Sequence, residues 1–283
     1  MLQRGEWAMK TIIIAEIGEN HYGQWDLCRG MVEEVAGGGG TYAKFQTYTA
    51  EQFGKDHVWY EEFKKVVLPE AEHFEMQALC QERGIGFLCS TFTQRSTTFL
   101  VDRMGCAELK LASSRVTDLA LLDYVNSRAD QVQRVYLSTG MSTLEEVREA
   151  VGRLGRIEEL YLLHCTSQYP TEDENVNLRA MVTLQDAFPE YAIGYSDHSR
   201  GIEACLAAVA LGAQVLEKHF TYHVQMPGDD HEGALTPETL GELVQGVQRI
   251  ERMLGTGDKK PVAAEQKAMA ALRVEMREVG FDT

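Results

Sequence analysis

The sequence lacks the cysteine spacing that marks zinc knuckles and dense disulfide frameworks. Its six cysteines are scattered and form no CxxC pair, standing at Cys28, Cys80, Cys89, Cys106, Cys165 and Cys205. Scattered cysteines of this kind are typical of reduced, mostly buried thiols. The pattern therefore predicts a cytoplasmic protein without structural disulfides.

Other features are absent or scarce. No low-complexity tract occurs, which argues against disorder. The N-terminus has no long apolar segment, and the apolar run at residues 11–17 is too short to cross a bilayer, so we expect no membrane association. Lys and Arg number 27 against 43 Asp and Glu, a formal charge of −16. This balance argues against a broad nucleic-acid surface, but a local lysine cluster could still bind a small anion.

Short apolar runs alternate with amphipathic stretches along the whole chain. Eight runs have the length of strands, at residues 11–17, 42–46, 86–91, 108–112, 134–138, 160–165, 192–196 and 214–219. This βα period predicts an α/β protein with a (β/α)8 TIM barrel, a fold of ~250 residues. A doubly wound open sheet is the rival, but no glycine fingerprint follows the first strand.

Helices are predicted between the strands, at residues 26–36, 70–83, 96–104, 144–152, 178–187 and 201–211. Thr143 and Glu146 have the spacing of a capping box, and Thr236 precedes a proline at the first helical position. No interdomain linker is evident. We expect residues 1–283 to form one barrel domain with a C-terminal helical extension, a loop and a last helix against the barrel, from about residue 256.

Polar residues stand at or just beyond the end of every predicted strand. They include Glu16, Lys44, Gln46, Ser90, Thr91, Lys110, Ser113, Ser138, Tyr169, Ser196, His198, Glu217 and His219. In a barrel the C-terminal ends of all eight strands converge on one face, where barrel enzymes carry their active sites. Polar groups buried without partners cost free energy, so core packing alone explains such a set poorly.

Two histidines at successive strand ends, His198 and His219, predict a divalent metal site. They stand beside Asp197 and Glu217, and such sites suit Mn, Fe, Zn or Mg ions that act as Lewis acids. The alternative is that His198 caps a local turn and His219 is a hydrogen-bonded core histidine.

Two lysines within strands, Lys44 and Lys110, predict a phosphate site. The alternative is that both are surface groups whose stems lie along apolar residues. Glu16 follows an apolar run and needs a partner when buried, for which Lys44 or a metal is the natural choice.

The motifs at these strand ends resemble those of the N-acetylneuraminate (sialic acid) synthase family. They cover about residues 11–265 in family order: IAEIG at 14–18, NH at 20–21, AKFQT at 43–47, LKLAS at 109–113, LSTGM at 137–141, HCTS at 164–167, YPT at 169–171, GYSDH at 194–198, EKHF at 217–220 and PGDDH at 227–231. Any one of these motifs is weak evidence, whereas the whole series in register is specific.

The resemblance implies a synthase that joins phosphoenolpyruvate to an aldehyde sugar similar to an N-acylmannosamine. The product would be a sialic-acid-like 2-keto-3-deoxy acid, released with phosphate. The implied phosphoenolpyruvate contacts are Lys44, Lys110, Ser113, Ser138 and Ser196, with Ser167 nearby and Thr91 as a further substrate contact. The implied sugar contacts are Gln46, Tyr169 and Asp230. His198 and His219 would hold Mn²⁺, or Mg²⁺ or another divalent ion, and Glu16 would handle protons or position water.

The sequence departs from the family pattern at three places. Arg115 replaces the usual glutamate two residues after Ser113, and the proline usual between Thr91 and Phe92 is absent. The typical member continues into an antifreeze-like C-terminal domain that supplies an arginine to the partner subunit's sugar site. This chain ends at residue 283, so we expect the barrel domain alone, and a homodimer.

The arginine at position 115 leads to a hypothesis about the acceptor sugar. We expect Arg115 to contact the acceptor and to favour an aldehyde that carries an acidic group over neutral N-acetylmannosamine. The alternative is that Arg115 pairs with a surface carboxylate such as Asp118.

Two other functions remain open at this point. One is a metal-dependent barrel aldolase or epimerase that does not use phosphoenolpyruvate, against which Lys44, Lys110 and Ser138 argue because such enzymes need no phosphate clamp. The other is a non-catalytic barrel that binds a sugar or a partner synthase. That role has no chemical need for His198 and His219.

Overall fold

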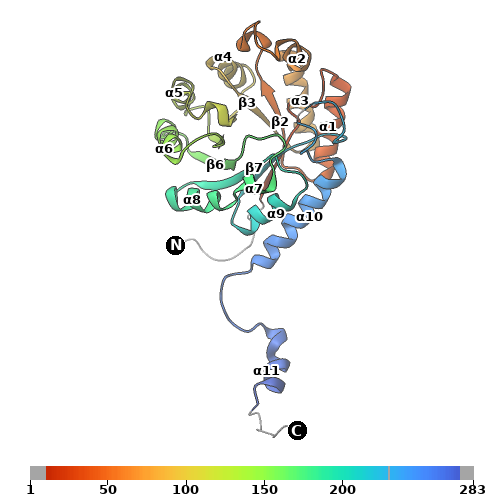
Figure 1. Ribbon diagram of the computed structural model, residues 1–283, viewed down its shortest axis with the longest axis vertical. Coiled ribbons are helices and arrows are strands. Elements are labelled where there is room, and N and C mark those ends of the chain that lie inside the picture. The colour runs from red at the N-terminus through yellow and green to blue at the C-terminus, as the bar shows by residue number, and fades with distance from the viewer. Residues whose placement is uncertain (1–10, 229, 275–283) are drawn as a thin grey trace.

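The computed structural model, which describes residues 11–228 and 230–274, is a closed barrel of eight parallel strands in chain order (Figure 1). The strands are β1 (Ile12–Glu16), β2 (Tyr42–Thr47), β3 (Gly86–Thr91), β4 (Glu108–Leu111), β5 (Arg134–Ser138), β6 (Glu159–Cys165), β7 (Ala192–Asp197) and β8 (Val215–His219). Each predicted strand is present, with its ends displaced by no more than one residue. The prediction of a (β/α)8 barrel is confirmed.

Helices that follow the strands surround the barrel, and a last helix, α11, stands apart from it (Figure 1). They are α1 (Trp25–Gly38), α2 (Tyr60–Val66), α3 (Glu70–Arg83), α4 (Gln94–Thr98), α5 (Leu119–Ser127), α6 (Leu144–Arg153), α7 (Asp173–Val176), α8 (Arg179–Ala187), α9 (Glu203–Ala210), α10 (Pro237–Leu254) and α11 (Gln266–Leu272). Thr143 caps α6 in a capping box with Glu146, as predicted. Thr236 caps α10, whose first residue is a proline.

Two apolar layers stabilise the barrel. Between the strands and the helices lies the large core, and inside the ring a smaller cluster consists of Ile14, Leu88, Tyr136, Leu163 and Val215. Side chains alternate between the two faces of a strand, so the next inward-facing residue toward each C-terminal end lies two positions further on. Those next positions are largely polar. The inner cluster is therefore the floor on which the polar C-terminal end of the barrel rests.

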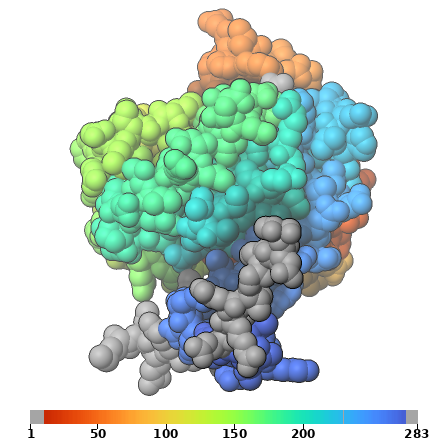
Figure 2. All heavy atoms as spheres, turned by 60° about the horizontal axis from the view of Figure 1, so that its bottom comes forward, coloured from red at the N-terminus to blue at the C-terminus, as the bar shows by residue number. Residues whose placement is uncertain are grey.

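Two segments project from opposite edges of the barrel. Residues 50–66, which include α2, form the orange projection in Figure 2, and the blue C-terminal segment lies at the opposite edge. The helix predicted to pack against the barrel is α11, but none of its residues is buried, and it stands apart from the barrel (Figure 1). This arrangement does not support the predicted packing, and the domain organisation stays a prediction. Residues 1–10, 229 and 275–283, including the end of the predicted extension, lie outside the described residues.

The beginning of β1 and the end of α10 are in contact. The backbone N–H and the hydroxyl of Thr11 both donate to Glu251, at 2.7 and 2.8 Å. No helix within residues 11–228 and 230–274 is both long and apolar enough to cross a membrane. The six cysteines are free thiols, and five of them are buried.

Candidate active site

Four charged side chains meet inside the barrel directly above the apolar floor. Lys44 Nζ lies 2.6 Å from Glu16 Oε2 and 3.8 Å from Glu217 Oε1, and Lys110 Nζ lies 3.6 Å from Glu217 Oε2. Both lysines are only 2% exposed. This geometry excludes the alternative that they are surface groups. The register explains the meeting, because Glu16 is the cross-strand partner of Lys44.

The two lysines differ in how fully they are paired. Burial opposes the charge on Lys44, but Glu16 and Glu217 more than offset it and raise its pKa. Burial lowers the pKa of Lys110. The carboxylate of Glu217 opposes this lowering, and the nearby ammonium group of Lys44 adds to it. Burial opposes the charge on Glu217 too, yet the two lysines hold its pKa below the ordinary value. Lys110 is therefore the lysine with more to gain from an added anion.

Serine hydroxyls surround this charged cluster. Ser90 Oγ accepts a hydrogen bond from Lys44 Nζ at 3.0 Å, and Ser196 Oγ donates to Glu217 at 3.3 Å. Ser138 Oγ is buried and has no hydrogen-bond partner within the described part of the chain. A buried hydroxyl without a partner costs free energy, so Ser138 is placed to bind a ligand atom.

A glycine beyond β5 opens a cradle between two serine hydroxyls. Gly140 N–H donates to Ser113 Oγ at 3.0 Å. A Cβ atom at Gly140 would lie 2.6 Å from Ser167 Oγ and 2.8 Å from Ser113 Oγ, closer than real contacts allow. The sequence-predicted residues Ser113 and Ser167 are thus brought together, and a side chain at position 140 would push their hydroxyls aside.

The two predicted metal histidines lie close together at the same C-terminal end of the barrel. The ring centroids of His198 and His219 are 5.5 Å apart, and the ring of Tyr169 lies 4.1 Å from that of His198. His198 Nδ1 lies 3.0 Å from the Thr166 carbonyl oxygen, which favours the tautomer with a free lone pair on Nε2. His219 Nδ1 is buried, and no hydrogen-bond partner for it occurs among residues 11–228 and 230–274.

These donors fit a divalent ion that retains open coordination positions. Within those two ranges, no three His, Cys, Asp or Glu side chains gather into a metal-binding group. The candidate ligands are the two imidazoles, and an ion held by them would keep positions open for substrate and water. The metal itself remains a prediction.

Directly behind the two histidines lies a buried ion pair. Lys218 Nζ lies 2.5 Å from Asp197 Oδ2 and donates to the Ser199 carbonyl oxygen at 2.5 Å. Asp197 also accepts hydrogen bonds from the Tyr195 hydroxyl and from Ser199. The pair links β7 to β8 at the residues adjacent to His198 and His219.

Two of the predicted sugar contacts lie at the mouth of the barrel. Gln46 Nε2 donates to Glu16 Oε1 at 3.0 Å, so this amide borders the charged cluster. Asp230 Oδ2 lies 3.6 Å from His219 Nδ1. Asp230 comes from the loop after β8, and it therefore reaches over the opening rather than lining the barrel wall.

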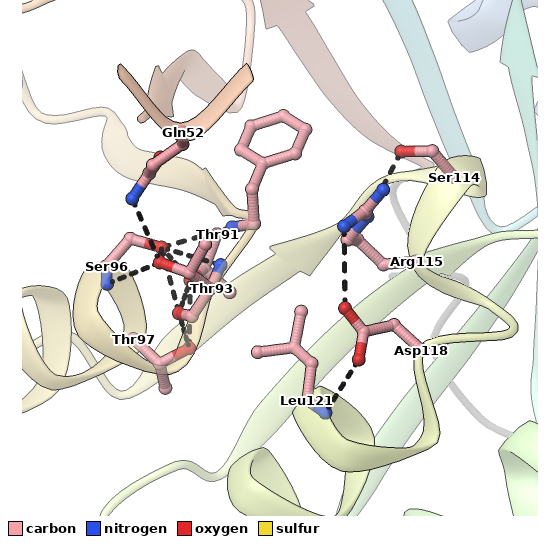
Figure 3. Close-up of polar contacts among 10 residues, drawn as sticks. Gln52, Thr91, Thr93, Ser96, Thr97, Ser114, Arg115, Asp118 and Leu121 are labelled. Atoms are coloured by element: carbon pink, nitrogen blue, oxygen red, sulfur yellow. Dashed lines mark hydrogen bonds and ion pairs between the residues drawn. The ribbon is translucent and has the colours of Figure 1, made fainter. Parts of the chain in front are cut away.

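Thr91 and Arg115 form their hydrogen bonds with residues that are not part of this cluster (Figure 3). The Thr91 hydroxyl is 2.8 Å from each of the hydroxyls of Ser96 and Thr97 at the start of α4. Strand alternation explains this, because Ser90 faces the barrel and its neighbour faces the helices. The arrangement gives no support to a substrate contact through the Thr91 hydroxyl.

Arg115 pairs with Asp118, which the sequence offered as the alternative to a contact with the acceptor. Its guanidinium lies 3.4 Å from Asp118, the residue that caps α5, and its Nε donates to Ser114 Oγ at 3.3 Å (Figure 3). The guanidinium is thus engaged within its own loop. A direct contact between Arg115 and the acceptor is not supported by this arrangement.

Three residues at the site were absent from the predicted set of binding or catalytic residues. Ser90 and Glu217 follow from the alternation rule, since each lies two positions beyond a floor residue, Leu88 and Val215. Glu19 accepts a hydrogen bond from the Tyr48 hydroxyl. No signal in the sequence distinguishes Glu19 from an ordinary loop carboxylate.

Comparison with known proteins identifies the family of this chain. The NeuB family model matches residues 31–259. An N,N'-diacetyllegionaminic acid synthase from Legionella pneumophila is 36% identical over 94% of this chain and 79% of its own length. N-acetylneuraminate-9-phosphate synthase from Mus musculus is 33% identical over 89% of this chain and 74% of its own.

A solved structure extends the similarity to three dimensions. The crystal structure of N-acetylneuraminic acid (sialic acid) synthetase from Leptospira borgpetersenii, in complex with citrate, has a TM-score of 0.86 and 34% identity, covering 94% of this chain and 93% of that one. With the barrel, the strand-end cluster and these relatives in agreement, the chain belongs to the NeuB family and is a condensing synthase for acids of the sialic type.

Proposed function

We propose that this protein condenses phosphoenolpyruvate with the open-chain form of an N-acylmannosamine-like sugar, giving a 2-keto-3-deoxy sugar acid and phosphate. The observation that carries the proposal is the pair of buried lysines, Lys44 and Lys110, inside the barrel. A barrel aldolase or epimerase that takes no phosphoenolpyruvate has no need of two buried cations beside an unpartnered hydroxyl.

The lysines and the cradle would bind the anionic substrate. Lys110, the less completely paired lysine, would gain a charge-assisted contact with the phosphate or carboxylate. The hydroxyl of Ser138, and those of Ser113 and Ser167 beside Gly140, would donate hydrogen bonds to the remaining oxygens of the anion. Bound in this way, the enol carbon is oriented toward the mouth, where the aldehyde enters.

The reaction balances without an oxidant or reductant. The enol carbon of phosphoenolpyruvate forms a bond to the aldehyde carbon, and the aldehyde oxygen gains a proton to become a hydroxyl. Water then adds to the cationic carbon that bears the phosphate and loses one proton, which leaves a hydroxyl on that carbon. The C–O bond to phosphate breaks as this hydroxyl gives its proton to the departing phosphate, and the ketone remains. Glu16, which is hydrogen-bonded by Gln46 and paired with Lys44, would hold the water or take its proton.

The two histidines suit a divalent ion, Mn²⁺ or Mg²⁺. Such an ion, when bound, acts as a Lewis acid toward the aldehyde oxygen. The chain's own contribution is to keep both imidazoles oriented, through the Thr166 carbonyl beside His198 and through the Asp197–Lys218 pair behind the two rings.

The experiment is to incubate the protein with phosphoenolpyruvate and Mn²⁺ against a panel of aldoses and to follow phosphate release. We expect release only when an aldose is present, together with a new 2-keto acid in equal amount. Phosphate release that does not depend on the aldose, or no release with any aldose, would contradict the proposal. The Lys110→Ala variant serves as the inactive control.

A further inference from the structure

The loop after β1 places an extra carboxylate at the mouth of the barrel. Gly18 takes a left-handed conformation, and a Cβ there would lie 3.1 Å from Glu16 Oε1 and 3.2 Å from Gln46 Nε2. The chain therefore turns tightly over the charged cluster before it reaches Glu19. Asn20 Nδ2 donates to the Phe220 carbonyl oxygen at 2.8 Å, which ties this loop to the end of β8.

Tyr48 holds the Glu19 carboxylate in place. The Tyr48 hydroxyl donates to Glu19 Oε1, and the tyrosine itself is only 5% exposed. Its ring packs edge-on against Phe53, Phe63 and Phe92, with centroids 5.4, 5.7 and 5.9 Å away. A rigid donor of this kind orients the acid, because Tyr48 cannot move without disturbing the aromatic cluster.

Glu19 has carboxylates rather than cations for neighbours. Burial, followed by the carboxylates of Asp230 and Glu16, raises the pKa of Glu19 to about 7, against the opposing effect of the Tyr48 hydrogen bond. Glu16 is already paired with Lys44. Among the described residues, no lysine or arginine forms an ion pair with Glu19 or Asp230.

The position of Glu19 and Asp230 relative to the lysines indicates that these two acids would contact the second substrate, the aldehyde sugar. Lys44 and Lys110 lie on the barrel floor, whereas Glu19 and Asp230 come from loops that follow β1 and β8. An aldehyde that reacts with phosphoenolpyruvate on the lysines must extend outward past these loops.

We propose that Glu19, oriented by Tyr48 beside Asp230, determines acceptor specificity by favouring a neutral polyhydroxylated sugar and excluding one that carries a phosphate or carboxylate. This inference rests on the proposed function. Carboxylates accept hydrogen bonds from hydroxyl and amide N–H groups, and they repel an anionic substituent in the same place. It also replaces the sequence-based hypothesis that Arg115 favours an acidic aldehyde.

The test compares two acceptors, N-acetylmannosamine and its 6-phosphate, by phosphoenolpyruvate-dependent phosphate release at about pH 8.5, above the pKa of Glu19, so that its carboxylate is charged. The parent should use the neutral sugar and discriminate against the phosphorylated one. Glu19→Gln keeps the size of the side chain and removes its charge, so the ratio of kcat/KM for phosphorylated over neutral sugar should rise about tenfold or more. Tyr48→Phe, which frees the acid, should shift the same ratio by less.

Two controls separate specificity from damage to the fold. Glu145→Gln makes the same charge change at an exposed position on α6 and should leave the ratio unchanged. The KM for phosphoenolpyruvate should stay within about twofold in Glu19→Gln, because the lysine clamp is not altered.

The outcomes distinguish this inference from the proposed function. Efficient use of the phosphorylated sugar by the parent, or an unchanged ratio in Glu19→Gln, would overturn the role of Glu19 while leaving the proposed reaction intact. No phosphate release with either sugar, or with any other aldose, would overturn both.

Discussion

The buried ion pair between Asp197 and Lys218 leads to a sharp prediction about stability. Replacing Lys218 with methionine removes the cation but keeps a similar side-chain volume. Asp197 would then be a buried carboxylate without its counter-ion, and it is 1% exposed. Removing one partner of a buried pair typically costs about 3–5 kcal/mol. Tyr195 and Ser199 still donate to the carboxylate, so we expect the lower end of that range.

The measurement is urea unfolding followed by circular dichroism, with thermal unfolding in parallel. A loss of about 3 kcal/mol should lower the Tm by roughly 6–12 °C for a chain of this size. The matched control is Arg153→Met, which breaks an exposed pair with Asp123 at 3.0 Å and should cost less than about 1 kcal/mol.

A double variant separates charge from packing. Asp197→Asn combined with Lys218→Met removes both charges and should recover part of the lost stability, because no uncompensated ion remains. Equal losses in Lys218→Met and in the Arg153→Met control would refute the reasoning. Such a result would mean that Asp197 is solvated or protonated at no cost.

Further predictions concern ligands, shape and pH. Lys110→Ala should weaken phosphoenolpyruvate binding by ~2–5 kcal/mol, measured by calorimetry; an unchanged affinity would point to another substrate. Gly140→Ala should raise the KM for phosphoenolpyruvate because the methyl group fills the cradle, whereas Gly152→Ala, in open space on α6, should not. The pKa of Glu19 in the folded protein is about 7, above its ordinary 4.5. The free energy of unfolding should therefore fall as pH rises from about 4.5 to 7, by at most about 3 kcal/mol. Glu19→Gln should flatten that dependence in urea melts at several pH values. His198→Ala and chelator treatment should each abolish turnover without unfolding the protein; full activity in chelator would exclude the metal role.

The sequence predicted the barrel well because its strands are short, apolar and regularly spaced. Lys44, Lys110, His198 and His219 were predicted as site residues because each lies within such a run or just beyond its end. Thr91 was placed in the same set, although its hydroxyl bonds to α4. Proximity to a strand end does not say which face a side chain takes, and the parity of the strand decides that.

Loop residues were harder to predict than strand residues. Arg115 and Glu19 both lie beyond strand ends, where no periodicity fixes the direction of a side chain. Arg115 turns to Asp118, three residues further along, whereas Glu19 is held by Tyr48 from a different strand's loop. A contact between distant loops depends on barrel closure, which the local sequence does not encode.

The bond between Thr11 and Glu251 has a consequence for the order of the chain. It brings the start of the first strand beside the end of the last barrel helix. A short linker between these two points would make the barrel's backbone circular, and new ends could then be cut elsewhere. The exposed turn at Gly155 and Arg156, before β6, is a suitable place. Every strand would keep its neighbours in such a circular permutant, so the ring of polar side chains would be expected to re-form although its residues follow one another in a different order.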